Sequence, residues 1–312
     1  MSFLFSDEYW KVKKKNGVSP FQMGVAYMGG SFWQTTVDNS ITAYRNILLN
    51  QSKDINGNMV DPKVAFRQTN AIFMKHPLSA SFSGLSPRLF GVVTKRTPKF
   101  GFLLGWSYLS GNNGEVGFTE SFVASVASAP FISPWRFLER QQRLTLKETG
   151  KQRPMMDVIR ECGTKNYLPL FRGSTALMCH SFASALLGLF GQPVLCKKIE
   201  KELGEKTTLG KHFANLVASC IVSPAYVIIS NPINRCENII QSNPISAQPI
   251  TLRGAIKEYS IDVKQFGMSG FFRGQAVGIT KAVISLSLFH MGRMALTDFF
   301  KARNERLGHI PK

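Results

Sequence analysis

A pattern that occurs three times along the chain limits what this sequence can fold into. In each copy an aromatic residue stands two positions before a glycine, at Phe82–Gly84, Phe171–Gly173 and Phe272–Gly274. Upstream of each glycine a long segment ends, and these ends align on Thr42, Pro134 and Pro232. Two independent landmarks share one period of about a hundred residues, which is typical of a fold built from three equivalent units.

Each unit contains two long segments that we expect to be helical. The odd-numbered helices are predicted over residues 21–50, 115–144 and 211–241, and the even-numbered helices over 85–109, 174–199 and 275–302. A helix of about 25 to 30 residues suits a tilted membrane span. The chain then divides into a basic and aromatic N-terminal segment at 1–16 and three repeats at 17–112, 113–205 and 206–312.

Composition taken alone favours a soluble protein. The sequence is 44% hydrophobic with a mean hydropathy of −0.03, and it lacks the run of about 18 uncharged apolar residues that marks a simple transmembrane helix. Helices that line a watery cavity are apolar on one face only, so this composition does not exclude a membrane protein. The most apolar stretch, residues 213–230, lies in a predicted long helix.

The chain is strongly basic, with 38 lysines and arginines against 19 acidic residues. Such an excess favours an anionic partner, namely nucleic acid, anionic lipid or an acidic solute. The sequence shows no RNP box, zinc-finger spacing or heptad repeat, so we expect no nucleic-acid partner. Residues 9–15 combine aromatic rings with lysines, which suits a membrane interface; a disordered tail and a protein-docking arm are the alternatives.

Little in the sequence indicates catalysis or a bound metal. The five cysteines include no Cys-x-x-Cys pair, so neither a metal site nor a disulfide framework is predicted, and no cofactor is expected. No nucleophile–base constellation that would indicate an enzyme appears. The N-terminus carries acidic residues and no long apolar core, unlike a signal or transit peptide.

Several motifs resemble those of the mitochondrial carrier family. The sequence NPINRCENIIQ at 231–241 is similar to the family's Pro-x-[Asp/Glu]-x-x-[Lys/Arg] motif, and LPLFRG and GFFRG are similar to its aromatic-basic-glycine steps. The run TKRTPKF, within 84–102, resembles the second helix of carriers for dicarboxylates and oxo-acids. The resemblance covers nearly the whole chain. It implies six tilted transmembrane helices around a central cavity, with pseudo-threefold symmetry, in the mitochondrial inner membrane.

The resemblance also implies helix kinks and lipid sites. Pro134 and Pro232 should kink their helices, with a weaker bend near Thr42, because proline removes a backbone hydrogen bond. Phosphates of cardiolipin or another anionic lipid should bind at helix starts, where backbone N–H groups, the helix dipole and a basic side chain favour an anion. The implied residues are Arg172, Gly173, Arg273 and Gly274. The first repeat has Ser83 instead of a base, and the glycines could serve only as helix starts.

The gates of a working carrier are degraded in this sequence. The family closes its cavity with ion pairs between an acid and a base on neighbouring odd-numbered helices. The acid positions here hold Tyr44, Arg136 and Asn234, and the base positions hold Ile47, Glu139 and Glu237. Only Arg136 and Glu237 can pair, with reversed signs. At the second gate the acid positions hold Leu104, Pro193 and Arg293, and the base positions hold Ser107, Cys196 and Leu296. Neither gate can form a full ring of ion pairs.

Basic residues mark a possible anion site on the even-numbered helices. The resemblance places substrate contacts near Gly91, at His180 with Ser181, and at Lys281. A charge facing lipid costs about 3 kcal/mol or more, so Lys281 should face the cavity. The contacts predicted for a transporter are Arg88, Lys95, Lys99, His180 and Lys281. The alternative is a set of ancestral residues in a protein that no longer transports, with His180 a hydrogen-bonded core histidine.

Two functions are compatible with these patterns. The degraded gates and the basic N-terminal segment favour a non-transporting or weakly transporting structural subunit of a larger inner-membrane complex. Family resemblance favours a transporter of a small anionic metabolite that works by alternating access. A soluble nucleic-acid binder would explain the charge but not the repeats.

Overall fold

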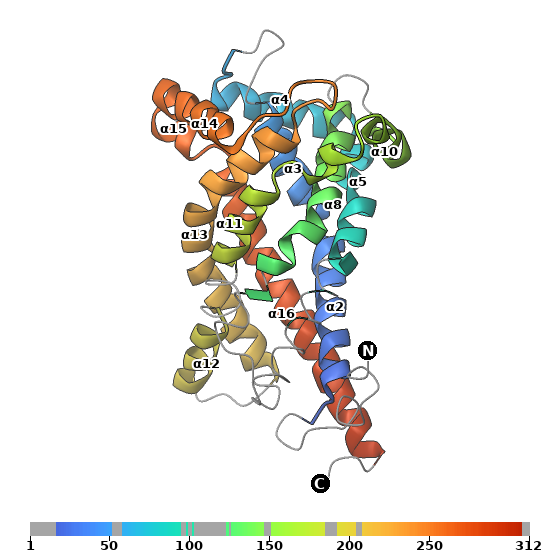
Figure 1. The fold of residues 1–312 in the computed structure, drawn as a ribbon. Helices are drawn as coiled ribbons and strands as arrows, with labels where there is room; N and C mark the ends of the chain where they lie inside the picture. The colour runs from blue at the N-terminus through green and yellow to red at the C-terminus, as the bar shows by residue number, and fades with distance from the viewer. Residues whose placement is uncertain are drawn as a thin grey trace.

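The helices follow one another in an order that repeats three times along the chain (Figure 1). The computed structural model describes residues 17–51, 58–94, 123–124, 126–146, 151–184, 192–203 and 208–307, together with 98 and 102. Within these residues the fold is all-α, as predicted. The N-terminal segment at 1–16 and the side chains of Lys95 and Lys99 lie outside the described residues.

In each repeat a long helical segment leads to short helices, then to a glycine, then to a second long segment. The first repeat contains α2 (Pro20–Val37), α3 (Asn39–Asn50), α4 (Pro62–Lys75), α5 (Pro77–Phe82) and a helical stretch at 85–94. The second contains α8 (Ala129–Leu144), α10 (Met155–Gly163), the 3-10 helix η2 (Leu168–Phe171), α11 (Ser174–Ser184) and α12 (Gln192–Leu203). The third contains α13 (Thr208–Gln241), α14 (Leu252–Phe266), α15 (Met268–Phe271) and α16 (Gln275–Arg306).

The long helices form an elongated bundle, and α4, α10, α14 and α15 lie together at one end of it, here called the short-helix end (Figure 1). Small apolar clusters attach these helices to the odd-numbered helices. Ile47 packs against Ala80, Phe137 against Val158, and Cys236 against Ala255. A comparable cluster occurs in each repeat, and two of the clusters also include a residue of the next repeat, Leu146 and Ile245.

The three landmark glycines connect neighbouring repeats. Gly84, Gly173 and Gly274 all have positive φ, between +68° and +81°, a conformation that only glycine adopts without strain. Each lies directly against the odd-numbered helix of the next repeat. A Cβ added at Gly84 would meet Glu139 and Arg143, one at Gly173 would meet Gln241, and one at Gly274 would meet Leu49. The third contact returns to the first repeat. The three repeats therefore close into a ring with approximate threefold symmetry.

The burial pattern of α13 is inverted relative to a helix of a soluble protein. Its exposed face carries Phe213, Leu216, Ile221, Ile228 and Ile229, whereas its buried face carries the polar Asn215, Ser219, Ser223, Ser230 and Asn231 beside Ala214, Ala218, Val222 and Val227. Soluble proteins bury the apolar face of a surface helix. A helix with apolar residues outside and polar residues inside matches a lipid surround and a polar interior.

One helix, at Phe213–Gln241, is long and apolar enough to cross a membrane, judged on the described residues by length and composition alone. The other long helices fall below that threshold, in keeping with the low mean hydropathy of the chain. Six transmembrane spans therefore stay a prediction.

The predicted helix boundaries agree closely with the structure for the third repeat and less well elsewhere. Pro134 lies inside α8 and Pro232 inside α13, as the kink prediction requires. The first odd-numbered helix is interrupted at Asp38, between α2 and α3, and not near Thr42. The interruption lies where the Asp38 carboxylate is bound by other helices, as described below. Much of the even helix predicted at 85–109 lies outside the described residues.

The ring of glycine contacts predicts a difference between two glycine-to-alanine variants. Gly84→Ala combines left-handed strain, about 1–2 kcal/mol, with a Cβ 2.8 Å from Glu139 Cγ. The control is Gly254→Ala in α14, where φ is not positive and an added Cβ would come no closer than 3.3 Å to Ile250 Cγ2. The midpoint of thermal unfolding in detergent should fall clearly further for Gly84→Ala. Equal losses would show that Gly84 does not press on α8.

Candidate functional site

A cavity of about 260 Å³ lies between the helices of all three repeats. Its wall includes Arg88 from the stretch at 85–94, His180 from α11 and Lys281 from α16. Gly91 and Ser181, at the other predicted contact positions, also line it. The structure thus brings together three of the five residues predicted to contact an anion, and the other two, Lys95 and Lys99, lie outside the described side chains.

Asp38 lies at the break between α2 and α3 in the first odd-numbered helix. Its side chain is fully buried, and its Oδ1 lies 2.7 Å from Arg88 Nη2. Arg88 also donates to Asn39 at 2.9 Å, and the Ser285 hydroxyl of α16 donates to Asp38. Sequence reasoning did not identify Asp38, although a lone acid in a predicted apolar helix is a signal that could have found it.

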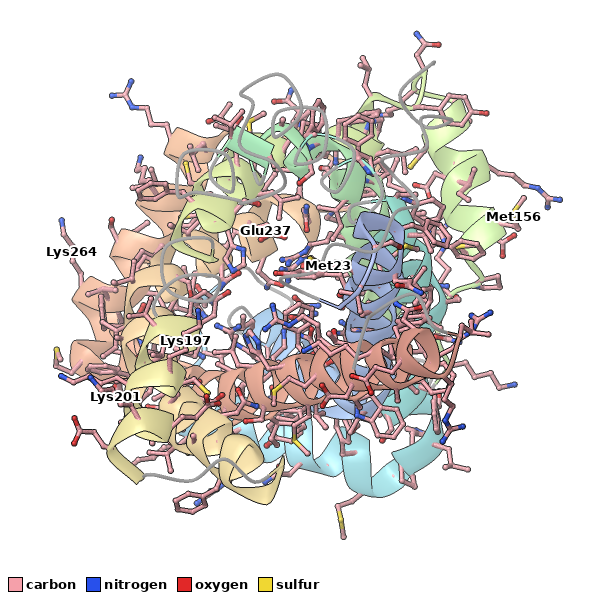
Figure 2. All side chains as sticks on the ribbon, turned by 90° about the horizontal axis from the view of Figure 1, so that it is seen from below. Met23, Met156, Lys197, Lys201, Glu237 and Lys264 are labelled. Atoms are coloured by element: carbon pink, nitrogen blue, oxygen red, sulfur yellow. The ribbon has the colours of Figure 1, made fainter. Side chains whose placement is uncertain are left out.

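Glu237 lies toward the middle of the bundle, as the view along the bundle shows (Figure 2). Its side chain is 0% exposed, and Arg136 Nη1 donates to both carboxylate oxygens at 3.1 Å. Arg140 Nη2 lies 3.5 Å from Oε1. The predicted pair of Arg136 and Glu237 therefore forms, with a second arginine on the same carboxylate. This arrangement joins α8 to α13.

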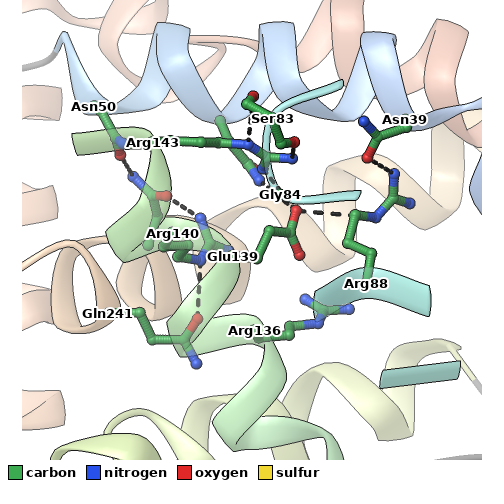
Figure 3. A network of polar contacts seen from close by, with 12 residues as sticks. Asn39, Asn50, Ser83, Gly84, Arg88, Arg136, Glu139, Arg140, Arg143 and Gln241 are labelled. Atoms are coloured by element: carbon green, nitrogen blue, oxygen red, sulfur yellow. Dashed lines mark hydrogen bonds and ion pairs between the residues drawn. The ribbon is translucent and has the colours of Figure 1, made fainter. Parts of the chain in front are cut away.

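Glu139 is the second buried carboxylate of this region (Figure 3). Arg143 Nη1 donates to it at 2.6 Å within α8, and Asn46 of α3 donates at 3.2 Å. Arg88 Nε lies 3.9 Å away. Arg143 also donates to the Ser83 backbone carbonyl at 2.8 Å, directly before Gly84. Glu139 and Arg143 thus connect α8 to the first repeat.

Amide side chains complete the connection around the axis. Arg140 donates to Gln241 at 2.9 Å and also to Asn238. Asn238 and Ser242 both donate to Asn50 at the end of α3, at 2.9 and 2.8 Å. We call Glu139 and Glu237 with these arginine and amide partners the axial network. It bridges α3, α8 and α13 in every pairwise combination, and its members are largely shielded from solvent.

The first repeat presents other residues to the axis than the alignment predicted. Tyr44 donates to Asn70 of α4 and packs against Phe73, and Ile47 belongs to the apolar cluster with Ala80. Arg45 and Asn46 line the cavity instead. Without a proline at Thr42 the landmark gives only an approximate register, and a shift of one residue turns a helix by about 100°. Arg140 and Arg143 were missed because the family motif directs attention to other positions.

The second set of gate positions is only partly described. Arg293 stacks over the Tyr27 ring, with its guanidinium carbon 5.6 Å from the ring centroid, and Cys196 lies near Glu200. A Cβ added at Gly29 would collide with the Leu296 side chain, and one added at Gly30 would collide with the backbone carbonyl of Phe289. Leu104, Ser107 and the Pro193 side chain lie outside the described residues. Small residues let α2 and α16 pack closely at this crossing.

The two basic glycine steps differ in how their arginines are used. Arg172 is partly exposed and donates to the carbonyls of Pro244, Ile245 and Ala247, at 3.1 to 3.4 Å. Arg273 is 3% exposed and lies 2.8 Å from Asp262. The expectation that Arg273 contacts a lipid phosphate therefore does not fit, because a buried acid already neutralises its guanidinium.

The partner of Arg273 also fixes α14. Asp262 accepts from Arg235 of α13 as well, and Arg273 donates to the Val60 carbonyl at 2.6 Å. The Tyr259 ring lies beneath Arg235, with 5.9 Å between ring centroid and guanidinium carbon. Burial raises the pKa of the Tyr259 hydroxyl.

No protein-family model matches the chain, and no curated protein matches it.

The axial network predicts unequal effects for two charge-removing variants. Glu237→Gln leaves the buried Arg140 and the partly exposed Arg136 without their shared carboxylate, and removing one partner of a buried ion pair costs about 3–5 kcal/mol. The control is Glu161→Gln, whose partner Arg153 lies 2.6 Å away with both side chains about one-third exposed, a pair that contributes about 0–1 kcal/mol. Thermal unfolding in detergent should show a large loss only for Glu237→Gln. A loss no larger than that of the control would show that the pairs are not buried together in solution.

Proposed function

We propose that this chain is a carrier-fold protein of the mitochondrial inner membrane with six spans. We further propose that it serves as a static, non-transporting or weakly transporting subunit of a larger membrane complex. The observation that carries the proposal is the axial network, which ties all three odd-numbered helices together at the short-helix end.

Three features support a membrane setting. The chain forms three equivalent helical units whose glycine contacts close into a ring. The exposed face of α13 is apolar while its buried face is polar. A polar cavity lies on the inside, lined by charged residues from several helices. The mitochondrial inner membrane is proposed from the motif resemblance, because the geometry itself names no compartment.

The network supports a static role on energetic grounds. An alternating-access protein needs two states of similar free energy, each held by contacts that break in the other. Opening the short-helix end would separate Glu237 from Arg136 and Arg140, and breaking a buried pair costs about 3–5 kcal/mol. A swing from one dominant state to the other takes about 5.5 kcal/mol of differential stabilisation. The sequence offers no acid at the opposite gate positions to balance this loss.

A second candidate is a transporter of a small anion. The observation that favours it is the basic cavity, whose surface includes Arg88, His180 and Lys281, one from each repeat. Lys95 and Lys99 would extend this surface if they face inward. The transporter requires the axial network to open during each cycle.

The exchange of solutes decides between the two candidates. In proteoliposomes the static protein should show no robust exchange of dicarboxylates, oxo-acids or nucleotides, and after mild detergent extraction the native protein should migrate inside a large complex. Saturable exchange that disappears in Lys281→Ala would establish the transporter and reject the static proposal.

We also propose anionic lipid at the glycine steps. Backbone N–H groups at the starts of α11 and α16 suit a phosphate, and Arg172 is partly exposed beside one of them. Native mass spectrometry should show anionic lipid retained by the wild type and reduced in Arg172→Ala. Lys165→Ala, an exposed base on the same repeat, is the control and should keep its lipid. Unchanged retention in Arg172→Ala would reject a role for this arginine.

A further inference from the structure

Two of the short helices, α4 and α14, carry an excess of exposed bases that α10 lacks. These bases are Lys63, Arg67, Lys75, Arg253, Lys257 and Lys264. α4 contains no acid, and the two acids of α14, Glu258 and Asp262, are partly and fully buried. α10 carries Asp157, Arg160 and Glu161 and is therefore net negative. The charge at the short-helix end is thus concentrated on the first and third repeats.

The two basic helices begin with the same pattern. Each starts with an exposed base, an exposed apolar residue and a second exposed base: Lys63, Phe66 and Arg67 in α4, and Arg253, Ile256 and Lys257 in α14. These positions coincide when the repeats are aligned on Gly84 and Gly274. The pattern therefore occurs at equivalent places on two repeats.

The positions of these bases oppose the stability of the helices. Lys63 and Arg253 lie in first turns that hold no acid, where the positive end of the helix dipole disfavours a cation. A second base follows four residues later in each helix, and like charges at that spacing repel each other. Among the described residues no ion pair forms with the side chains of these four bases. An unfavourable arrangement that occurs twice suits a surface that meets an anionic partner.

The bases of α14 form a stripe that leads toward the start of α4. Arg253, Lys257 and Lys264 share one helix face, because steps of four and seven residues are close to whole turns. Arg273, which follows α15, donates to the Val60 carbonyl directly before α4 at 2.6 Å. α14, α15 and α4 lie together at the short-helix end (Figure 1), and Lys264 points away from the bundle (Figure 2). We call Lys63, Arg67, Arg253, Lys257 and Lys264 the basic surface.

The shape of this surface favours a protein partner over a membrane. A helix that inserts into a membrane interface presents one continuous apolar face. The exposed apolar residues of α14, Ile256 and Ile261, are five residues apart and so lie about 140° apart around the helix. The base stripe runs between them. At the start of α4 a shallow hollow of about 370 Å³ is lined by Pro62, Lys63, Phe66 and Arg67. It offers an apolar side chain a place between two cations.

We infer that the basic surface docks an acidic segment of a partner protein, in which carboxylates flank an apolar side chain. The carboxylates pair with the bases of α14 and α4, and the apolar side chain enters the hollow beside Phe66. This inference rests on the proposed function, because it names the surface through which the chain joins the larger complex. The side of the short-helix end formed by α10 takes no part in the contact.

The first test uses the native complex after mild detergent extraction. A carbodiimide joins a lysine to a contacting carboxylate without adding a spacer, and mass spectrometry identifies the linked peptides. Lys63, Lys257 or Lys264 should be joined to aspartate or glutamate of another protein. Lys151 and Lys165, exposed lysines of the second repeat, are internal controls and should give no such link. Links from the controls alone, or none from the basic surface, would overturn the inference.

The second test reverses charge on the full chain. The double variant Arg67→Glu with Lys257→Glu should reduce the share of protein inside the large complex at least about tenfold, because like charges that face each other across an interface are strongly unfavourable. After purification it should unfold at or above the wild-type temperature, since repulsion within each helix is relieved. The control, Lys151→Glu with Lys165→Glu, makes the same change in charge on the second repeat and should keep the complex.

The outcomes separate the docking surface from the proposed function. If the first double variant keeps the complex, the docking inference is wrong and the proposed function stands. If the wild type migrates alone, both are rejected. If the first double variant keeps the complex but retains less anionic lipid in native mass spectrometry, the surface binds lipid headgroups, and the protein partner is rejected.

Discussion

The structure depends most on the carboxylate of Glu237, which lies fully buried between Arg136 and Arg140. This one acid holds α8 against α13, and the same arginines lead on to Asn238, Gln241 and Asn50. Because these contacts join the odd-numbered helices at the short-helix end, the walls of the cavity keep their relative positions. A buried ion pair does not by itself add stability over an apolar contact. Its effect is to make separation of the helices expensive once the pair exists.

The rest of the fold supports the same arrangement. Each glycine step presses on the odd-numbered helix of the next repeat, and at two steps a side chain of that helix also holds the preceding carbonyl. Arg143 donates to Ser83, and Gln241 donates to Arg172. Polar groups thus gather inside the ring, while apolar residues such as Phe213 and Ile221 face out. This distribution of residues matches a protein that is surrounded by lipid and has a polar interior.

The sequence predicts the helical repeats and the glycine steps well, because periodicity and turn chemistry are local. It also predicts the Arg136–Glu237 pair, which follows from a motif with intact prolines. The prediction from sequence fails where a contact between helices determines the local structure. The first helix is interrupted at Asp38, whose carboxylate contacts Arg88 and Ser285 from other helices. Arg45 replaces Tyr44 at the axis because the first repeat lacks the proline that sets the register. Arg273 pairs with Asp262, an acid that no motif indicated.

The most direct test of the account is the distance across the short-helix end. Spin labels can be attached at Met74 of α4 and Met268 of α15, which are 85% and 66% exposed, after the exposed Cys179 and Cys220 are replaced by serine. Pulsed electron paramagnetic resonance should give one narrow distance distribution, unchanged by phosphate or succinate, and Glu237→Gln should broaden it toward longer distances. Two populations in the otherwise unaltered protein that shift with added anion would contradict the account, because the axial network would then open and close.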